Sequence, residues 1–277
     1  MMLNCLRLIA VTIFLCLLTA AASHAVVTLE SVEVDGTNDL NDNEGLISVG
    51  SGQTGNLEVL ICTTFSDGNN FFDGPPAGFE ILDAGACGGP GQCILGIFTG
   101  FAQSSGPSEN LCSWVDITQV YGGGSFRYSG VDNVNPIIDS ACESGTGGTA
   151  VAPSVITEPN SAVIRVAAFA SQLAGLVVQP DQVLEGSFSS TQIGDNGQAI
   201  EVRGLSFSYE EGGPTGSLDI PFLFLPGSSG WRACTIAIRT APHNIPTLSE
   251  WGLGAFAGLF GITAVWALRR RAVRGQG

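Results

Sequence analysis

An acidic stretch between residues 35 and 44 contains the side chains best suited to bind a metal ion. Its carboxylates belong to Asp35, Asp39, Asp42 and Glu44, and Asn41 and Asn43 add amide oxygens. Hard cations such as Ca²⁺ take oxygen ligands from loops of this kind. The stretch departs from the EF-hand pattern, because Glu44 stands where that pattern requires glycine. Two interpretations stay open, a calcium site and an acidic turn that holds no ion.

Cysteines form the second chemically distinctive group. Six of them follow the N-terminal apolar segment: Cys62, Cys87, Cys93, Cys112, Cys142 and Cys234. An even number is typical of disulfide-bonded proteins in oxidising compartments, and six cysteines allow fifteen pairings. Cys87 and Cys93 are close enough in sequence to close a small loop, and Cys62 and Cys234 both fall in apolar segments that a disulfide could join. The CxxC spacing typical of zinc sites is absent, which disfavours metal binding.

The chain offers few groups for acid–base or nucleophilic catalysis. It contains no lysine, and its two histidines, His24 and His243, lie outside residues 26–240. This excludes Ser-His-Asp and Cys-His nucleophiles, histidine metal sites and lysine Schiff bases from that region. No phosphate-binding GxxxxGK[ST] loop is present, nor a GxGxxG in a strand–turn–helix context. We therefore expect a protein that is not an enzyme. We expect no cofactor, except for Ca²⁺ if the calcium interpretation holds.

The charge balance limits the partners. Residues 26–249 hold five arginines and twenty-four carboxylates, a difference of −19. Such an acidic surface repels nucleic acid and anionic lipid headgroups, so we exclude both as partners. With so many carboxylates some pair always suits a glycosidase, so this pattern alone says little about catalysis.

Short apolar segments separated by Gly, Asp, Asn and Pro predict an all-β domain over residues 26–240. Residues 57–65 and 162–170 are continuous apolar runs that suit buried strands. Further strands are expected at residues 27–34, 79–82, 94–102, 125–131, 182–188, 200–209, 218–224 and 231–239. No segment of the domain repeats with a helical period. The pattern indicates a two-sheet antiparallel β-sandwich, jelly-roll-like in kind.

The first 25 residues have the features of a secretory signal peptide. Arg7 provides the positive charge, residues 8–22 form an apolar segment, and Ser23 and Ala25 are small residues at the −3 and −1 positions. We expect cleavage after Ala25, with the Sec translocon and a signal peptidase as partners.

A second apolar segment follows a short tether at residues 241–244. The tether leads to an eight-residue motif: Ile245, Pro246, Thr247, Leu248, Ser249, Glu250, Trp251 and Gly252. Residues 251–268 are long enough to cross a membrane as one helix. Arg269, Arg270 and Arg271 then stop transfer and keep residues 272–277 in the cytoplasm.

The motif, the apolar segment and the arginines over residues 245–271 resemble the IPTL-CTERM sorting signal, a relative of PEP-CTERM. The resemblance implies an exosortase-type membrane transpeptidase of Gram-negative bacteria as a partner. That enzyme removes the helix and releases or attaches the domain at the surface, often alongside exopolysaccharide production. An ordinary C-terminal anchor is the alternative interpretation.

A further resemblance concerns the domain itself. Residues 75–79 (PPAGF), 128–132 (YSGVD), 135–137 (NPI) and 152–154 (APS) occur in the order seen in a β-sandwich module of bacterial secreted proteins. This module is similar over about 180 residues and implies a fold but no activity. Phe79 and Ser129 depart from its usual residues.

Together these features favour an exported, non-enzymatic protein of the cell surface or matrix. Its precursor would be anchored in the inner membrane by the C-terminal helix, and its mature domain would be periplasmic, surface-bound or extracellular. The runner-up is a carbohydrate-binding or adhesive module that binds surface polysaccharide, for which Trp114, Trp231 and the pair Phe71-Phe72 are the candidate aromatic side chains. The third alternative is a glycan-active enzyme that uses carboxylates.

Overall fold

The computed structural model describes residues 26–37, 44–66, 72–88, 92–114, 121–147, 149–170, 184–193, 199–221 and 230–242. Residues 25–241 form one compact unit by themselves. Within the described residues, no helix has the length and apolar character needed to cross a membrane. The predicted signal peptide at residues 1–25 and the predicted helix at residues 251–268 lie outside this description.

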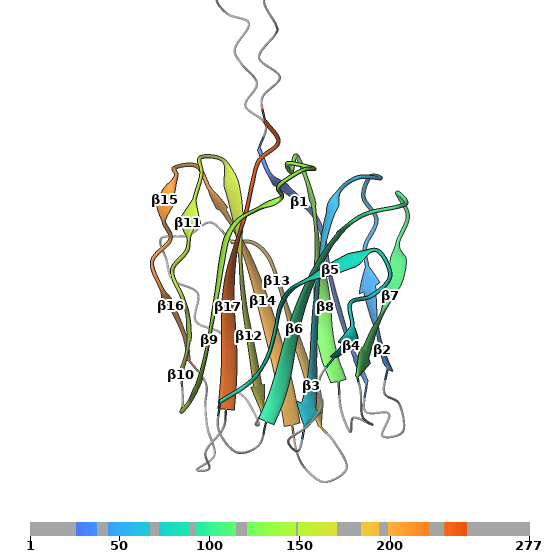
Figure 1. The fold of residues 1–277 in the computed structure, drawn as a ribbon, viewed down its shortest axis with the longest axis vertical. Coiled ribbons are helices and arrows are strands. Elements are labelled where there is room, and N and C mark those ends of the chain that lie inside the picture. The colour runs from blue at the N-terminus through green and yellow to red at the C-terminus, as the bar shows by residue number, and fades with distance from the viewer. Residues whose placement is uncertain are drawn as a thin grey trace, which may run out of the picture. The chain divides into compact units, whose positions relative to one another are not determined.

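The unit is built around two five-stranded antiparallel sheets (Figure 1). The first sheet has the order β1-β8-β3-β6-β5. Its strands are β1 (Thr28–Thr37), β8 (Tyr121–Ser129), β3 (Leu57–Ser66), β6 (Gln92–Phe101) and β5 (Phe79–Ala86). The second sheet has the order β13-β14-β12-β17-β9. Its strands are β13 (Leu184–Ile193), β14 (Ala199–Tyr209), β12 (Ser161–Ala170), β17 (Gly230–Ile238) and β9 (Ile137–Thr146).

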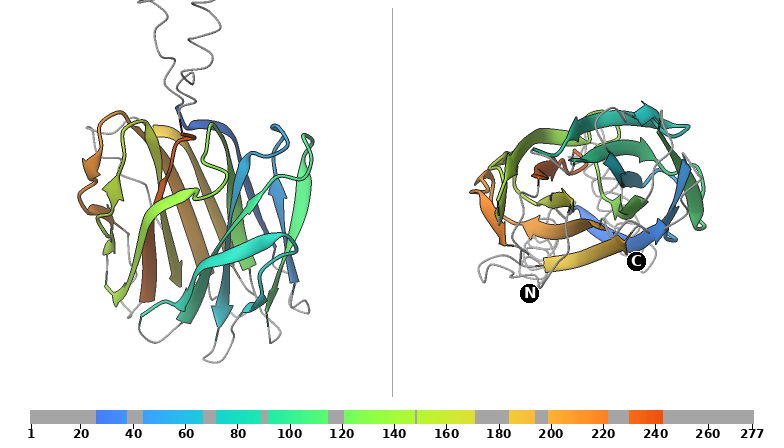
Figure 2. Two further views of the ribbon diagram at one scale, coloured as in Figure 1. Left: turned by 45° about the horizontal axis from the view of Figure 1, so that its top comes forward. Right: turned by 90° about the horizontal axis from the view of Figure 1, so that it is seen from below.

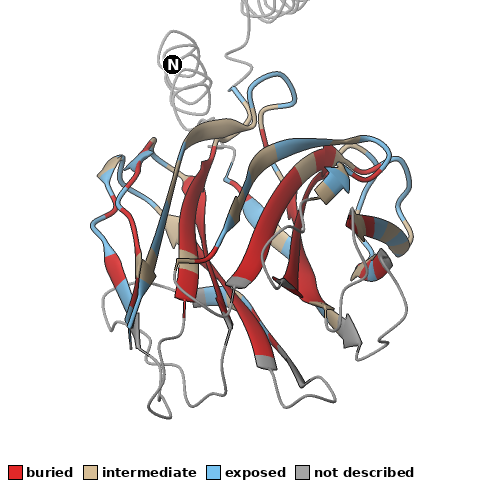
Figure 3. Cartoon of the chain, turned by 60° about the horizontal axis from the view of Figure 1, so that its bottom comes forward, coloured by how far each residue is buried: buried red, intermediate tan, exposed pale blue. Residues whose placement is uncertain are grey.

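The main hydrophobic core lies between these two sheets. Val59 and Ile61 of β3, Ile164 and Val166 of β12 and Ile236 of β17 belong to it, each at most 1% exposed. Alternate residues of each strand point to this core, as the two-residue period of a strand requires. Figure 3 shows the central strands buried over much of their length.

The outer face of the first sheet is covered by a small sheet of order β2-β7-β4. Its strands are β2 (Glu44–Val49), β7 (Ser108–Trp114) and β4 (Phe72–Gly74). Leu60 and Cys62 of β3 pack there against Ile47 and Trp114. Both faces of β3 are therefore buried, which explains why residues 57–65 read as a continuous apolar run instead of an alternating one.

The outer face of the second sheet is covered by two short strand pairs, visible beside β9 in Figures 1 and 2. One pair joins β10 (Thr149–Ala152) to β16 (Leu218–Pro221), and the other joins β11 (Ile156–Thr157) to β15 (Gly213–Pro214). Phe169 of β12 packs beneath the first pair with Ala152 and Leu218. The central strand β12 is thus buried on both faces, like β3.

The predicted all-β, two-sheet antiparallel sandwich is confirmed, and all ten predicted strands overlap an observed strand. The outer strands β2, β4, β7, β10, β11 and β15 and the edge strand β9 were not predicted. The expectation of a ten-residue loop at residues 35–44 is wrong at both ends. Asp35 lies within β1 and Glu44 begins β2, because strand pairing extends the ladders into this acidic stretch.

Candidate functional site

The end of the unit from which the sorting tail leaves is the candidate functional site. After β17 the backbone stays hydrogen-bonded to the turn at residues 130–136. Arg239 N donates to Pro136 O (2.7 Å), and Ala241 N donates to Gly130 O (2.7 Å). Thr240 forms an isolated antiparallel bridge with Val131. The chain is therefore held in place up to Ala241, four positions before Ile245.

The first described residues meet the same turn. Val27 is buried in the main core, and its N–H donates to Asn160 O (3.3 Å). Gly130 has a φ of +71°, and a Cβ at this position would lie 2.3 Å from Val26 O. Only glycine combines this φ with such a close approach without strain. The turn at Gly130 therefore contacts both the strand that follows the predicted cleavage site and the strand that leads to the sorting motif.

Polar contacts fix this turn. Asp132 Oδ1 accepts hydrogen bonds from Val134 N (2.8 Å) and Asn135 N (3.2 Å). These two backbone bonds lower the pKa of Asp132, with a smaller contribution from the charge of Arg239. Arg239 also forms an ion pair with Glu158 (3.2 Å). The exit of the tail is thus an ordered turn, and its geometry depends on an ionised carboxylate.

The sorting motif and the arginine cluster lie outside the described residues. This applies to Ile245–Gly252 and to Arg269, Arg270 and Arg271. Their predicted roles as recognition motif and stop-transfer sequence stay predictions, as does cleavage after Ala25.

All six predicted cysteines form disulfides in the structure. The pairs are Cys62–Cys112, Cys87–Cys93 and Cys142–Cys234, with Cα–Cα distances of 6.4, 5.1 and 4.1 Å. The expected small loop between Cys87 and Cys93 is present, whereas the suggested pairing of Cys62 with Cys234 is wrong. Cys62 faces the outer layer and reaches Cys112 of β7, and Cys234 lies directly opposite Cys142 of the neighbouring strand β9.

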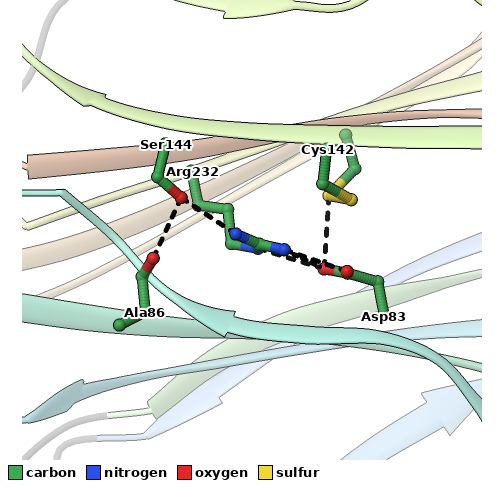
Figure 4. The surroundings of a disulfide bond; sticks show 6 residues. Asp83, Ala86, Cys142, Ser144 and Arg232 are labelled. Atoms are coloured by element: carbon green, nitrogen blue, oxygen red, sulfur yellow. Dashed lines mark hydrogen bonds and ion pairs between the residues drawn. A yellow bond between two sulfur atoms is a disulfide. The ribbon is translucent and has the colours of Figure 1, made fainter.

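The Cys142–Cys234 disulfide lies beside an ion pair that joins the two central sheets (Figure 4). Arg232 of β17 donates to both carboxylate oxygens of Asp83 on β5, at 2.7 to 3.0 Å. Asp83 and the two cysteines lie close enough for a metal cluster. The sulfurs are bonded to each other and Asp83 is paired with Arg232, so we assign a structural clamp and no metal site.

The predicted calcium ligands are only partly described. Asp35 is used within the sandwich, since its carboxylate accepts a hydrogen bond from Ser48 N and its carbonyl one from Ser190 Oγ (2.7 Å). Asp39 and Asp42 lie outside the described residues, as does the side chain of Glu44. Calcium binding stays a prediction.

Carboxylate chemistry finds little support in the geometry. Glu58 has a raised pKa because it is buried, and the charge of Arg127 opposes that shift. It forms an ion pair with Arg127 (3.5 Å). Asp139 accepts a hydrogen bond from Ile156 N (2.9 Å). The carboxylates named here hold strands and turns together.

The candidate aromatic side chains for sugar binding are packed inside. Trp114 is 1% exposed and Trp231 is 7% exposed. Phe72 lies on Phe98 and Trp114, with ring centroids 5.2 and 5.8 Å away, and so anchors β4 to the outer layer. Phe71 lies outside the described residues. In the described part of the chain, the exposed large apolar side chains are all aliphatic.

Arg127 has a structural role that the sequence analysis missed. Its guanidinium is fully buried on the outer face of the first sheet. It donates to four backbone carbonyls of the loops that cover that face, those of Gly50, Gln53, Ser104 and Gly106. A single arginine within an otherwise apolar or glycine-rich strand was the available signal, for Arg127 as for Arg165 in residues 162–170.

Comparison with protein families gives one match. Residues 245–271 fit the family model described as the IPTL-CTERM motif. No curated protein and no solved structure matches the chain, so the resemblance of the domain, over about 180 residues, to a secreted β-sandwich module stays a prediction. The matched segment begins four positions after the last fixed residue of the exit turn, and the chain thus carries an IPTL-CTERM sorting signal over residues 245–271.

Proposed function

We propose that this is an exported, non-enzymatic β-sandwich protein that an exosortase-type transpeptidase delivers to the cell surface or matrix. The observation that carries the proposal is the IPTL-CTERM match, which follows a compact β unit after a tether of a few residues. The sorting tail is the substrate in this scheme, and the sandwich is the cargo.

The fold supports a role as cargo. The three disulfides suit an oxidising compartment, where they persist. The chain contains no lysine, and residues 26–242 contain no histidine. The common bases and nucleophiles of hydrolases are therefore missing from this region.

The exit turn supports processing without damage to the fold. Within the described residues, Ala241 N makes the last backbone hydrogen bond before the motif, which begins at Ile245. Residues 242–251 span at most about 33 Å when extended. The sandwich would therefore stay close to the membrane until the tail is cut, and removal of the tail would leave β17 intact.

The proposal is tested by replacing Ile245, Pro246, Thr247 and Leu248 with alanine in the producing cell. We expect the variant to stay in the membrane fraction with its tail attached, while the wild-type domain is processed. A matched control replaces residues 103–106, in the loop between β6 and β7, with alanine. This variant should be processed normally. Equal processing of the motif variant and the wild type would contradict the proposal.

A glycan array with the purified domain addresses the runner-up function. The packed tryptophans predict no selective binding to neutral sugars. Reproducible binding of the domain to one class of glycan, lost when a residue of the domain is substituted, would instead favour the carbohydrate-binding alternative.

A further inference from the structure

The outer face of the second sheet buries two arginines next to each other. Arg165 of β12 is 0% exposed, and Arg203 of β14 is 7% exposed. Arg165 lies opposite Thr235 of β17, and Arg203 lies opposite Ala167, two positions along β12. Diagonal neighbours on one face of a sheet are about 7–8 Å apart, within reach of long side chains.

Several donors of this group are without a hydrogen-bond partner. Arg165 Nη2 donates to Thr215 O (3.1 Å) and Gly216 O (3.0 Å), but its Nε and Nη1 have no partner. Arg203 Nε pairs with Glu201, while Arg203 Nη1 has no partner. Thr235 Oγ1 is also unpartnered. Among these residues, two positive charges stand against the single negative charge of Glu201.

The first sheet shows how this fold neutralises a buried arginine when a carboxylate is present. Arg127 occupies the equivalent outer face, donates to four carbonyls and has Glu58 3.5 Å away. Arg165 has two carbonyls and the side chain of Tyr209 as hydrogen-bond partners, and it has no ion pair in the described part of the chain. Arg165 therefore has fewer carbonyl partners than Arg127 and lacks the counter-charge that Glu58 supplies to Arg127.

A buried charge without a counter-charge is costly, and so is each buried donor that makes no hydrogen bond. Burial lowers the pKa of Arg165, and the nearby Tyr209 opposes that shift. A water would accept these hydrogen bonds without balancing the charge, whereas a negative group does both, since two guanidinium ions stand beside the single carboxylate of Glu201. Such a group must be small, because Arg165 and Thr235 are fully buried.

We infer that Arg165, Arg203 and Thr235 bind a small monovalent anion of the size of chloride beneath the β10–β16 layer. The anion accepts hydrogen bonds from the free N–H groups of both arginines and from the threonine hydroxyl. It replaces the carboxylate that Glu58 supplies to Arg127. Divalent metal cations are excluded by the positive charge of the cluster.

The exported protein, purified as cells produce it, provides the test. Its Tm is measured in sodium chloride and in sodium gluconate at equal ionic strength, because a ligand that binds only the folded state raises the Tm. We expect chloride to raise the Tm by about 2–4 °C relative to gluconate. In Arg165→Met this difference should vanish, whereas the matched variant Arg127→Met should be less stable but keep it.

A second measurement needs no variant to fold. Crystals of the wild-type protein grown in sodium bromide should show an anomalous peak beside Arg165 Nε. An identical Tm in both salts, or a chloride effect that survives in Arg165→Met, would overturn the inference. So would bromide crystals without a peak at this position.

Discussion

At the scale of single residues, most of the positive charge of residues 26–242 lies on the central strands. Four of the five arginines in residues 26–242 lie on central strands, namely Arg127, Arg165, Arg203 and Arg232, and Arg239 directly follows β17. Four of the five form ion pairs. Because these cations are used within the fold, the remaining carboxylates set the charge of the surface, and the prediction that the domain binds no nucleic acid rests on this charge.

Gly204 of β14 permits the closest aromatic packing in the main core. A Cβ at this position would lie 2.4 Å from Phe188 and 2.7 Å from Phe126. Gly204→Ala should therefore destabilise the protein by about 1–3 kcal/mol through overpacking, measured by urea denaturation. Gly106→Ala is the control, since nothing lies within 4 Å of its added Cβ. Equal stability of the two variants would refute this packing argument.

Asp132 makes the stability of the exit turn, residues 130–136, depend on pH. Its pKa in the folded protein is lowered, chiefly by the hydrogen bonds from Val134 N and Asn135 N. Its contribution to stability is therefore complete above the unfolded-state pKa and is lost as the pH falls through the folded-state pKa. Asp132→Ala should lower the urea midpoint at about pH 7 and have a smaller effect at about pH 3. Glu109→Ala, which removes an exposed carboxylate of β7, is the control. A deficit of the same size at both pH values would argue against this role of Asp132.

At the scale of elements, the strands that could be predicted are the central ones. Residues 57–65 and 162–170 become β3 and β12, and their continuous apolar character arises because each sheet is covered on both faces. The sequence alone showed that these strands are buried, but not by what. The covering strands β2 and β7 are short and mix polar with apolar residues, since one of their faces is exposed.

The disulfide pairing could not be predicted for the same reason. Cys112 lies on β7 and Cys142 on β9, and neither strand was recognised from its sequence. Without them, Cys62 and Cys234 were the only cysteines in evident strands, which suggested a pairing that the structure does not have. The Cys87–Cys93 loop needed no knowledge of other strands, because its two cysteines are six positions apart.

The Cys62–Cys112 disulfide joins the outer three-stranded layer to the first central sheet. Replacing both cysteines with alanine should cost about 2–5 kcal/mol. We expect hydrogen exchange to rise in β2 and β7 before β3, because the outer layer loses its covalent link. The matched control is the double substitution Cys142→Ala and Cys234→Ala, whose strands keep their β9–β17 ladder. Unchanged protection of β2 and β7 in the first variant would show that packing alone holds this layer.

At the scale of the whole unit, the carboxylates protect the edges of the sandwich. The four edge strands are β1, β5, β9 and β13. They carry Glu30, Glu33, Asp35, Glu80, Asp83, Asp139, Glu143 and Glu185. Charged side chains on an edge strand discourage pairing with a second sheet. This arrangement disfavours edge-to-edge pairing of two copies of the sandwich.

The sorting signal could be predicted from the sequence, whereas the exit turn and the buried arginines could not. The sorting signal is a linear motif, so its residues could be recognised without a fold, and the family match over residues 245–271 agrees. The exit turn and the buried arginines depend on strand register. The sequence places Gly130, Val26 and Ala241 more than a hundred positions apart, and only the folded chain brings them together.

Mass spectrometry of the protein from the producing cell tests most directly whether the chain is exported and processed at both ends. The mature protein should begin at Val26, lack Arg269–Arg271 and hold its six remaining cysteines as three disulfides. A cytosolic product of full length with free thiols would contradict both the proposed export and the proposed sorting.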